Sequence, residues 1–194
     1  MHRLINRAVQ DFMRDSYGAE AWLRAVRSAG LEAADFEPML IYDDAVTEQI
    51  VAAVAGVLQR RPSDVLEDIG HYLVTDERMA PLRRLLRFGG VDFAEFVQSL
   101  DDLPDWARLA VEDLRLPPLE VRETGPGGWL LRLQGAPRGS GYAAVGMLRA
   151  MADDYGTLAF VEYQGAKEGA ECVEIRLLDQ DFAQGRAFQL AAGA

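Results

Sequence analysis

Hydrophobic side chains in the first part of the chain recur every three or four residues, which is the spacing of helices with one buried face. The first such run spans residues 4–13, and Gly18 follows it as a natural helix stop. Later runs are separated by residues that favour helix ends, and Ser63 stands where it could cap one of these helices. We therefore predict further helices over residues 19–29, 43–61, 63–77, 80–88, 92–100 and 104–114.

The pattern changes after the Leu-Pro-Pro at residues 116–118, where hydrophobic and polar residues begin to alternate as they do in β-strands. Two alternating segments flank a Thr-Gly-Pro-Gly-Gly turn, which indicates a hairpin. A helix comes next, and two more alternating segments flank a Gly-Ala-Lys-Glu-Gly turn. The predicted elements are strands over 119–123 and 129–134, a helix over 140–156, and strands over 157–164 and 171–179.

These elements predict an α+β fold. A mainly helical subdomain over residues 1–115 is followed by a ββαββ subdomain over residues 116–185, with a four-stranded antiparallel sheet and one helix. No internal repeat and no low-complexity linker separates the two parts. We therefore expect a single domain over residues 1–185, followed by a tail over residues 186–194.

The composition is typical of a soluble globular protein, with 49% hydrophobic and 26% charged residues. The net charge of −11 argues against a nucleic-acid partner, because phosphate binding needs a clustered basic face. No apolar run approaches the roughly 20 residues of a membrane-spanning helix. The charged N-terminus is unlike a signal peptide, so we expect a cytoplasmic protein. Cys172 is the only cysteine, which excludes an intrachain disulfide and a cysteine-based zinc site.

Patterns for catalysis or metal binding are weak. Neither of the two histidines, His2 and His71, has a second ligand at helical spacing. The Gly-Ser-Gly at residues 139–141 lacks the spacing of a nucleophile elbow and is typical of a loop before a helix. Acidic groups stand at predicted helix ends, namely Asp43–Asp44, Asp101–Asp102 with Asp105, and Asp153–Asp154. We predict no metal site and no enzymatic activity, with catalysis by paired carboxylates as the less favoured alternative.

Several segments resemble, in order and with few gaps, the heme nitric oxide/oxygen-binding (H-NOX) family, which includes the sensor domain of soluble guanylate cyclase. The similar segments are HRLINRAVQDFMRDSYGAEAW, IYDDAVTEQIVAAVAGVLQ, IGHYLV, FAEFVQSLDDL, the Pro117–Pro118 pair and SGYAAVGMLRAM. The resemblance implies an H-NOX-like fold, a sensory role and heme as the family cofactor. It also implies a signalling partner, such as a histidine kinase or a cyclic-nucleotide enzyme.

The family's heme ligand is a histidine that ends the phrase Leu-Asp-x-Leu-His, but here residues 100–104 read Leu-Asp-Asp-Leu-Pro. Proline has no side-chain donor atom, so Pro104 cannot coordinate iron. Its neighbours Asp105 and Trp106 do not replace it, because aspartate is a poor heme ligand and indole is not a ligand. In the family, ligand binding to the iron strains or breaks the iron–histidine bond, and the helix that carries the histidine then shifts. The helix that begins at Pro104 would therefore need another input.

A second family motif, Tyr-x-Ser-x-Arg, holds the two heme propionates. At the family spacing from Pro104, its three positions fall on Leu133, Gly135 and Pro137. All three polar side chains are therefore replaced, although Arg138 lies one residue past the arginine position. The resemblance thus predicts degenerate heme positions at Pro104, Leu133, Gly135 and Pro137, and a chain without heme.

The resemblance also indicates which side chains would surround a ligand. Leu73 stands near the position where oxygen-binding members carry a polar residue, and Tyr142 is one residue away from another. His71 is the candidate for an alternative axial ligand, two residues from the pocket-facing position. The ligand-pocket candidates are Ile5, Val9, Leu73, Pro104, Pro117, Leu133 and Tyr142.

We therefore predict a heme-free H-NOX-like signalling domain that relays either a small apolar ligand or a protein contact to a partner enzyme. An open cavity favours a ligand sensor, whereas a cavity filled by larger side chains favours a protein-interaction module. The alternative within the family is a heme-binding nitric oxide or oxygen sensor with unusual axial ligation, through His71 or another group.

Overall fold

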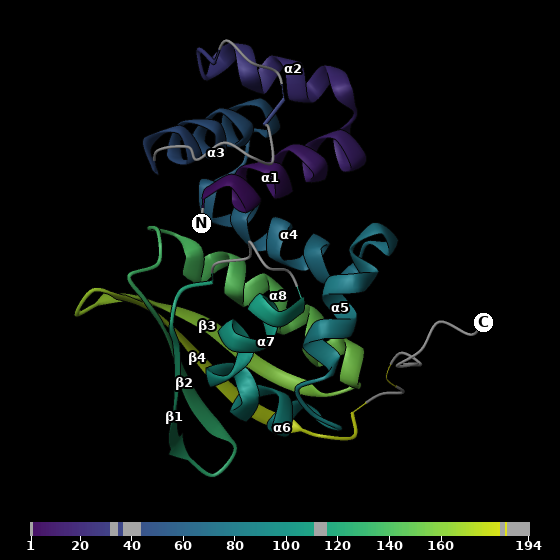
Figure 1. The fold of residues 1–194 in the computed structure, drawn as a ribbon, viewed down its shortest axis with the longest axis vertical. Helices are drawn as coiled ribbons and strands as arrows, with labels where there is room; N and C mark the ends of the chain where they lie inside the picture. The colour runs from purple at the N-terminus through teal and green to yellow at the C-terminus, as the bar shows by residue number, and fades with distance from the viewer. Residues whose placement is uncertain (1, 32–34, 37–43, 111–115, 183–184, 186–194) are drawn as a thin grey trace. The chain divides into compact units, whose positions relative to one another are not determined.

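The computed structural model describes residues 2–31, 35–36, 44–110, 116–182 and 185 of the 194-residue chain. The chain divides into two units, Met1–Ile69 and Gly70–Ala194, and the boundary falls inside a helix. Among the described residues, the first unit contains helices only, and the second contains helices and a four-stranded antiparallel sheet (Figure 1). The predicted α+β class is therefore confirmed. The single domain over residues 1–185 stays a prediction, and the tail over 186–194 lies outside the described residues.

The first unit is built mainly from α1 (His2–Tyr17), α2 (Ala19–Ser28) and α3 (Asp44–Leu58). Gly18 has a φ of +86°, a value that residues with a side chain rarely adopt, so the predicted stop between the first two helices is confirmed. The three helices pack against one another. Their buried apolar side chains include Val9, Phe12, Met13, Trp22, Ile50 and Val54.

The fourth helix, α4 (Pro62–Thr75), begins one residue before the predicted cap. Proline suits the first turn of a helix, because the N–H that it lacks would have no partner there. Ser63 therefore lies inside the helix, where its hydroxyl contacts the carboxylate of Asp64. The prediction of Ser63 as the helix cap is wrong.

Gly70 marks a close helix crossing within the second unit. A Cβ atom added at Gly70 would lie 2.0 Å from the carbonyl oxygen of Ala143 in the later helix α8 (Ser140–Tyr155). Only a residue without a side chain fits at that distance, so the glycine of the IGHYLV segment permits the crossing.

The sheet of the second unit has the strand order β1-β2-β4-β3, and every neighbouring pair is antiparallel. Both predicted hairpins are present. The second turn is shorter than predicted, because β3 continues to Lys167 and only Glu168 and Gly169 separate it from the next strand. The strands are β1 (Leu119–Gly125), β2 (Gly128–Gln134), β3 (Leu158–Lys167) and β4 (Ala170–Asp179).

Helix α8 and several short helices pack against one face of this sheet (Figure 1). The short helices are η1 (Glu77–Met79), α5 (Ala80–Arg87), α6 (Phe93–Gln98), η2 (Ser99–Asp101) and α7 (Leu103–Ala110). The last of these is the predicted helix at Pro104, and residues 111–114 of that prediction lie outside the described residues. Helices α5, α6 and α7, together with η2, contribute side chains to one hydrophobic core with the sheet, whereas η1 contacts α5. All of them belong to the second unit rather than to the first.

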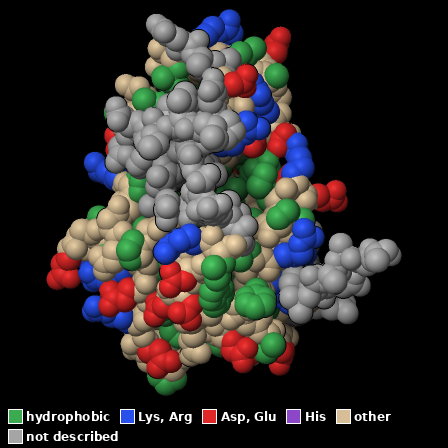
Figure 2. Space-filling view, in the orientation of Figure 1, with side chains coloured by type: hydrophobic (Ala, Val, Ile, Leu, Met, Phe, Trp, Pro, Cys, Tyr) green, Lys and Arg blue, Asp and Glu red, His purple; other side chains and the backbone are tan. Residues whose placement is uncertain are grey.

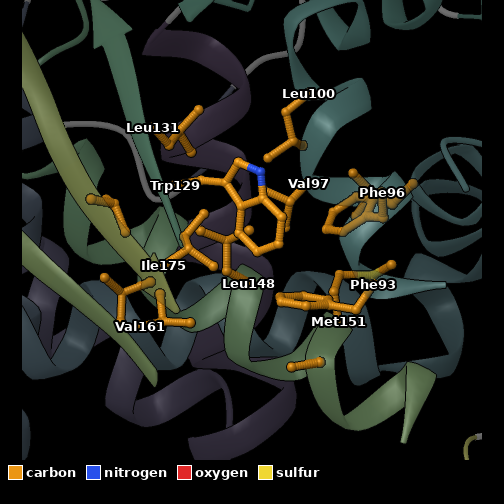
Figure 3. Packing of buried hydrophobic residues seen from close by; sticks show 14 of the residues in the cluster. Phe93, Phe96, Val97, Leu100, Trp129, Leu131, Leu148, Met151, Val161 and Ile175 are labelled. Carbon is orange, nitrogen blue, oxygen red and sulfur yellow. The ribbon is translucent and has the colours of Figure 1, made fainter. Parts of the chain in front are cut away.

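Trp129 of β2 lies at the centre of this core. Its indole ring is surrounded by side chains from the sheet, from the short helices and from α8 (Figure 3). Alternate residues of β2 and β4 point to the same face, as the period of a strand requires. Burial of each large apolar side chain contributes roughly 1.5–3 kcal/mol. The labelled neighbours are Val97, Leu100, Leu131, Leu148 and Ile175.

Candidate functional site

Pro104 is the second residue of α7 and is half-buried. A proline in the first turn leaves the helix intact, so α7 forms in spite of the substitution. Leu103 and Ala107 anchor the helix through buried side chains. Asp105 is exposed, and its carboxylate lies 3.1 Å from Arg108. This turn therefore directs apolar groups inward and carries its carboxylate on the surface.

Trp106 fixes α7 against the end of α5. Its ring meets the ring of Phe88 edge to face, with 5.9 Å between centroids. A Cβ atom on Gly89 would lie 3.2 Å from Cζ3 of Trp106 and 2.4 Å from the hydroxyl oxygen of Ser99, so glycine is required there. The turn that contains Pro104 is thus in direct contact with the loop between α5 and α6.

The three positions of the propionate motif carry no polar side chain. Leu133 near the end of β2 is buried in the core. Gly135 is exposed and has a φ of +60°, and its N–H donates to the carbonyl of Gly169. Pro137 offers only its carbonyl, which accepts the N–H of Ser140 at the start of α8. This stretch forms a turn that joins β2 to α8.

Glu171 is an important residue of this region that sequence analysis missed. It lies on β4 opposite Leu133, and it is only 3% exposed. Its carboxylate accepts the N–H groups of Gly139 at 3.0 Å and Gly141 at 3.1 Å. These amides lie at the N-terminus of α8 and have no partner within the helix, and the helix dipole stabilises a negative charge at this end. The helix lacks a side-chain cap of its own at Gly139, and a glutamate at a core-facing strand position was the available signal.

Two tyrosines extend this arrangement. The hydroxyl of Tyr163 donates to Glu171, and burial, followed by this interaction, raises the pKa of Tyr163 to about 12. A Cβ atom on Gly141 would lie 2.4 Å from the Tyr163 ring, so the ring covers the start of α8. Tyr142 is half-buried, and its ring centroid lies 4.3 Å from that of Tyr163. The candidate Tyr142 thus packs against the tyrosine that contacts the Glu171 carboxylate.

The remaining candidates differ in their surroundings. Leu73 of α4 is half-buried and Pro117 is buried. His71 is exposed, and its Nδ1 lies 3.3 Å from the hydroxyl of Thr75 on the same helix. Val9 is fully buried in the first unit. Ile5 belongs to α1, and its side chain lies outside the described part of the chain.

Three of the aspartates behind the enzyme alternative, Asp101, Asp105 and Asp154, make structural contacts, whereas Asp43 lies outside the described residues. Asp101 accepts the N–H of Val121 on the edge strand β1. Asp154, near the end of α8, is 1% exposed, and its carboxylate lies 2.7 Å from Arg83 and 3.7 Å from Arg87 of α5. Sequence analysis missed this ion pair, because 71 residues separate Arg83 from its partner.

The described residues contain no group of three His, Cys, Asp or Glu side chains that could hold a metal ion. Within the same part of the chain, no helix is long and apolar enough to cross a membrane.

A helical segment followed by a ββαββ unit is the architecture of haem-NO-binding domains, which form a sensor family related to soluble guanylate cyclase. The sequence pattern of the haem-NO-binding family matches residues 2–162. The chain therefore belongs to the H-NOX family, and the resemblance drawn from the sequence is confirmed.

Solved structures share this fold at low sequence identity. An H-NOX protein from S. oneidensis in the Fe(II)NO ligation state is 17% identical, with a TM-score of 0.73 over 92% of this chain and 100% of that one. The I5F mutant of T. tengcongensis H-NOX is 16% identical, with a TM-score of 0.70 over 91% of this chain and 97% of that one.

Curated relatives are longer proteins. Soluble guanylate cyclase 89Db of Drosophila melanogaster is 18% identical over 163 residues, which are 84% of this chain and 24% of that protein. The guanylate cyclase soluble subunit beta-2 of Rattus norvegicus is 28% identical over 91 residues, which are 47% of this chain and 13% of that protein. The chain thus spans about a quarter or less of the relatives that it matches.

Proposed function

We propose that this chain is an H-NOX-family sensory domain that works without bound heme. The observation that carries the proposal is Pro104, which stands at the family's ligand position in an intact α7. Its ring has no donor atom, and the nearest carboxylate, that of Asp105, is exposed and paired with Arg108. The residues present therefore do not fit the iron of a heme group.

The propionate side supports the same proposal. Leu133 contributes to the core instead of offering a hydroxyl group. The adjacent amides of Gly139 and Gly141 are occupied by the carboxylate of Glu171. A propionate placed at this turn would meet a buried carboxylate of like charge and no free amide from these two glycines. The chain itself supplies the anion for this helix terminus.

A domain of this kind would sense a small apolar ligand or a protein contact and pass the signal to a partner. The family's ligand position lies on α7, and Trp106 connects that helix to the loop between α5 and α6. We propose that α7 remains the output element and that the partner is a signalling protein, such as a histidine kinase or a cyclic-nucleotide enzyme. We also propose that the domain is not itself catalytic and acts in the cytoplasm.

Titration of the purified chain with hemin tests the proposal. We expect weak, non-stoichiometric absorbance without a sharp Soret band, and no spectral response to nitric oxide. A Pro104→His variant restores only one of the missing groups, and it shows whether iron ligation alone limits binding. A stoichiometric Soret band in the unmodified chain that shifts with nitric oxide would contradict the proposal. Loss of that band in His71→Ala would then assign the ligand to His71.

Native mass spectrometry distinguishes the two forms of the proposal. A retained small molecule of constant mass would indicate a ligand sensor. A chain that carries no such mass, even after incubation with lipid extracts, would indicate a core filled by side chains and a protein-interaction module.

A further inference from the structure

Four apolar residues at the junction of α5 and α7 form a surface that the protein leaves open to solvent. We call the set Phe88, Val91, Trp106 and Leu109 the Phe88 surface. Phe88 is 68% exposed and Leu109 is 89% exposed, and Val91 in the loop after α5 is exposed as well. Trp106 links Phe88 to Leu109, because its ring touches Phe88 and Leu109 follows it by one helical turn.

The segment that carries the Phe88 surface is strongly acidic. Residues 88–109 include five carboxylates and a single basic residue, Arg108, which is a denser negative charge than in the chain as a whole. Asp102, directly before α7, and Asp105, in its first turn, are both exposed. In Figure 2, hydrophobic and acidic side chains lie next to one another over the region of α6 and α7. The five carboxylates are those of Asp92, Glu95, Asp101, Asp102 and Asp105.

We propose that the Phe88 surface docks a basic, amphipathic helical segment of a partner protein. The apolar side of such a segment would cover Phe88 and Leu109, and its Lys and Arg side chains would face the exposed carboxylates at the start of α7, those of Asp102 and Asp105. A second copy of this chain does not fit, because two acidic surfaces of this kind repel each other. Arg84 of α5 is exposed one helical turn before Phe88, and its positive charge would repel the basic side chains of the partner. We therefore expect those side chains to lie on the side of the Phe88 surface nearer α7.

This inference rests on the proposed output through α7 and adds the chemistry of the partner. Trp106 is two residues from Pro104 and belongs to the same helix. A partner seated on Phe88 and Leu109 would therefore touch the same short helix that carries the ligand position, with Leu109 near its other end. A change in the position of α7 would alter the docking surface directly.

A displayed library of amphipathic helical peptides provides the test. Lys, Arg, Asp and Glu are allowed equally at the polar positions, and the selection uses the whole chain without added heme. We expect the enriched peptides to carry net positive charge and aromatic or aliphatic anchors, and to bind more weakly as the salt concentration rises.

Variants of the chain then locate the contact. Phe88→Ser and Leu109→Ser should each weaken binding of an enriched peptide by roughly tenfold or more, as expected for central anchors. Leu178→Ser is the matched control, since Leu178 on β4 is 58% exposed and lies outside the Phe88 surface. It should leave the affinity within about twofold. Circular dichroism confirms that the three variants remain folded.

Several outcomes would overturn the inference. These are a failure to enrich any peptide, enriched peptides that are neutral or acidic, and binding that survives Phe88→Ser and Leu109→Ser. A dimer of the free chain that both substitutions dissociate would assign the surface to a second copy instead. Because the selection is made without heme, its failure is independent of the hemin titration.

Discussion

Asn6 in the first unit and Asp154 in the second are both almost fully buried, but they differ in their partners. Asn6 of α1 is 0% exposed, and neither atom of its amide group has a hydrogen-bond partner among the described residues. Asp154 has two arginines beside it, and the ring of Tyr155 stacks under the guanidinium of Arg87 at 3.8 Å. Each carboxylate oxygen of Asp154 thus has an arginine within ion-pair distance, whereas the neutral amide of Asn6 is left unsatisfied.

The difference indicates where stability is gained and lost. A buried carboxylate with cationic partners becomes strongly destabilising only when one side of the pair is removed. A buried amide without partners is already a cost of about 1–3 kcal/mol in the native state. Removing the Asp154 carboxylate should therefore destabilise the protein, whereas removing the Asn6 amide should stabilise it. The following predictions test that contrast from the largest effect to the smallest.

Asp154→Ala should lower the free energy of unfolding by about 3–5 kcal/mol, because it leaves Arg83 and Arg87 without their buried counter-ion. Urea denaturation monitored by circular dichroism measures the change. Asp153→Ala is the control, since Asp153 is exposed on the same turn of α8, and it should change stability by no more than about 0.5 kcal/mol. Equal effects of the two substitutions would refute the structural role of the Asp154 pair.

The same substitution at two helical glycines should give opposite results. Gly70→Ala places a methyl group against the Ala143 backbone and should destabilise the protein by about 1–3 kcal/mol. Gly56→Ala in α3 has no atom within 4 Å of the new methyl group, and it should stabilise the protein by about 0.5–1 kcal/mol. Thermal unfolding of both variants shows whether each substitution raises or lowers the stability of the protein. A stabilising Gly70→Ala would mean that α4 and α8 do not cross as closely as described.

Asn6→Leu should stabilise the protein by about 1–2 kcal/mol, because it removes two unsatisfied polar atoms and keeps the branching of the side chain. Gln10→Leu is the matched comparison on the same helix. The Gln10 side chain accepts the N–H of Phe36 at 2.8 Å and donates to Asp35, so its loss should destabilise by about 1–3 kcal/mol. If chemical denaturation shows that both substitutions stabilise the protein, or that both destabilise it, the predicted contrast between these two amides is wrong.

Ionisation of two tyrosines of the second unit should lower the stability of the protein at high pH. Burial raises the pKa of both Tyr155 and Tyr163 to about 12, from an ordinary value of 10.0. The folded state therefore holds these protons more tightly than the unfolded chain. Their contribution is complete below pH 10 and is lost as the pH rises towards 12. Absorbance of tyrosinate should show two late steps, which Tyr155→Phe and Tyr163→Phe remove one at a time. Titration of both hydroxyls near the ordinary pKa of 10.0 would contradict the prediction.

Much of the fold follows from local signals in the sequence. The apolar spacing predicts α1 and α2, and alternation with glycine-rich turns predicts both hairpins. These signals depend on neighbouring residues, so a single sequence contains them. The error at Ser63 was local too, because Pro62 begins the helix one residue earlier.

The candidate site was less predictable. The family phrase led to Pro104, since its position is fixed relative to neighbouring residues. Glu171 and Asp154 could not be found in this way, because their partners lie 32 and 71 residues away in the chain. Periodicity places such residues on a face but does not indicate which backbone amide or arginine that face meets.

The carboxylate of Glu171 makes the proposed loss of heme difficult to reverse by single substitutions. Once it caps α8, a later return of the three propionate-binding side chains would leave a negative charge in the way. Removing that charge first would expose the amides of Gly139 and Gly141 and weaken the start of the helix. Under the proposed function, each single substitution back towards a heme site is therefore unfavourable on its own.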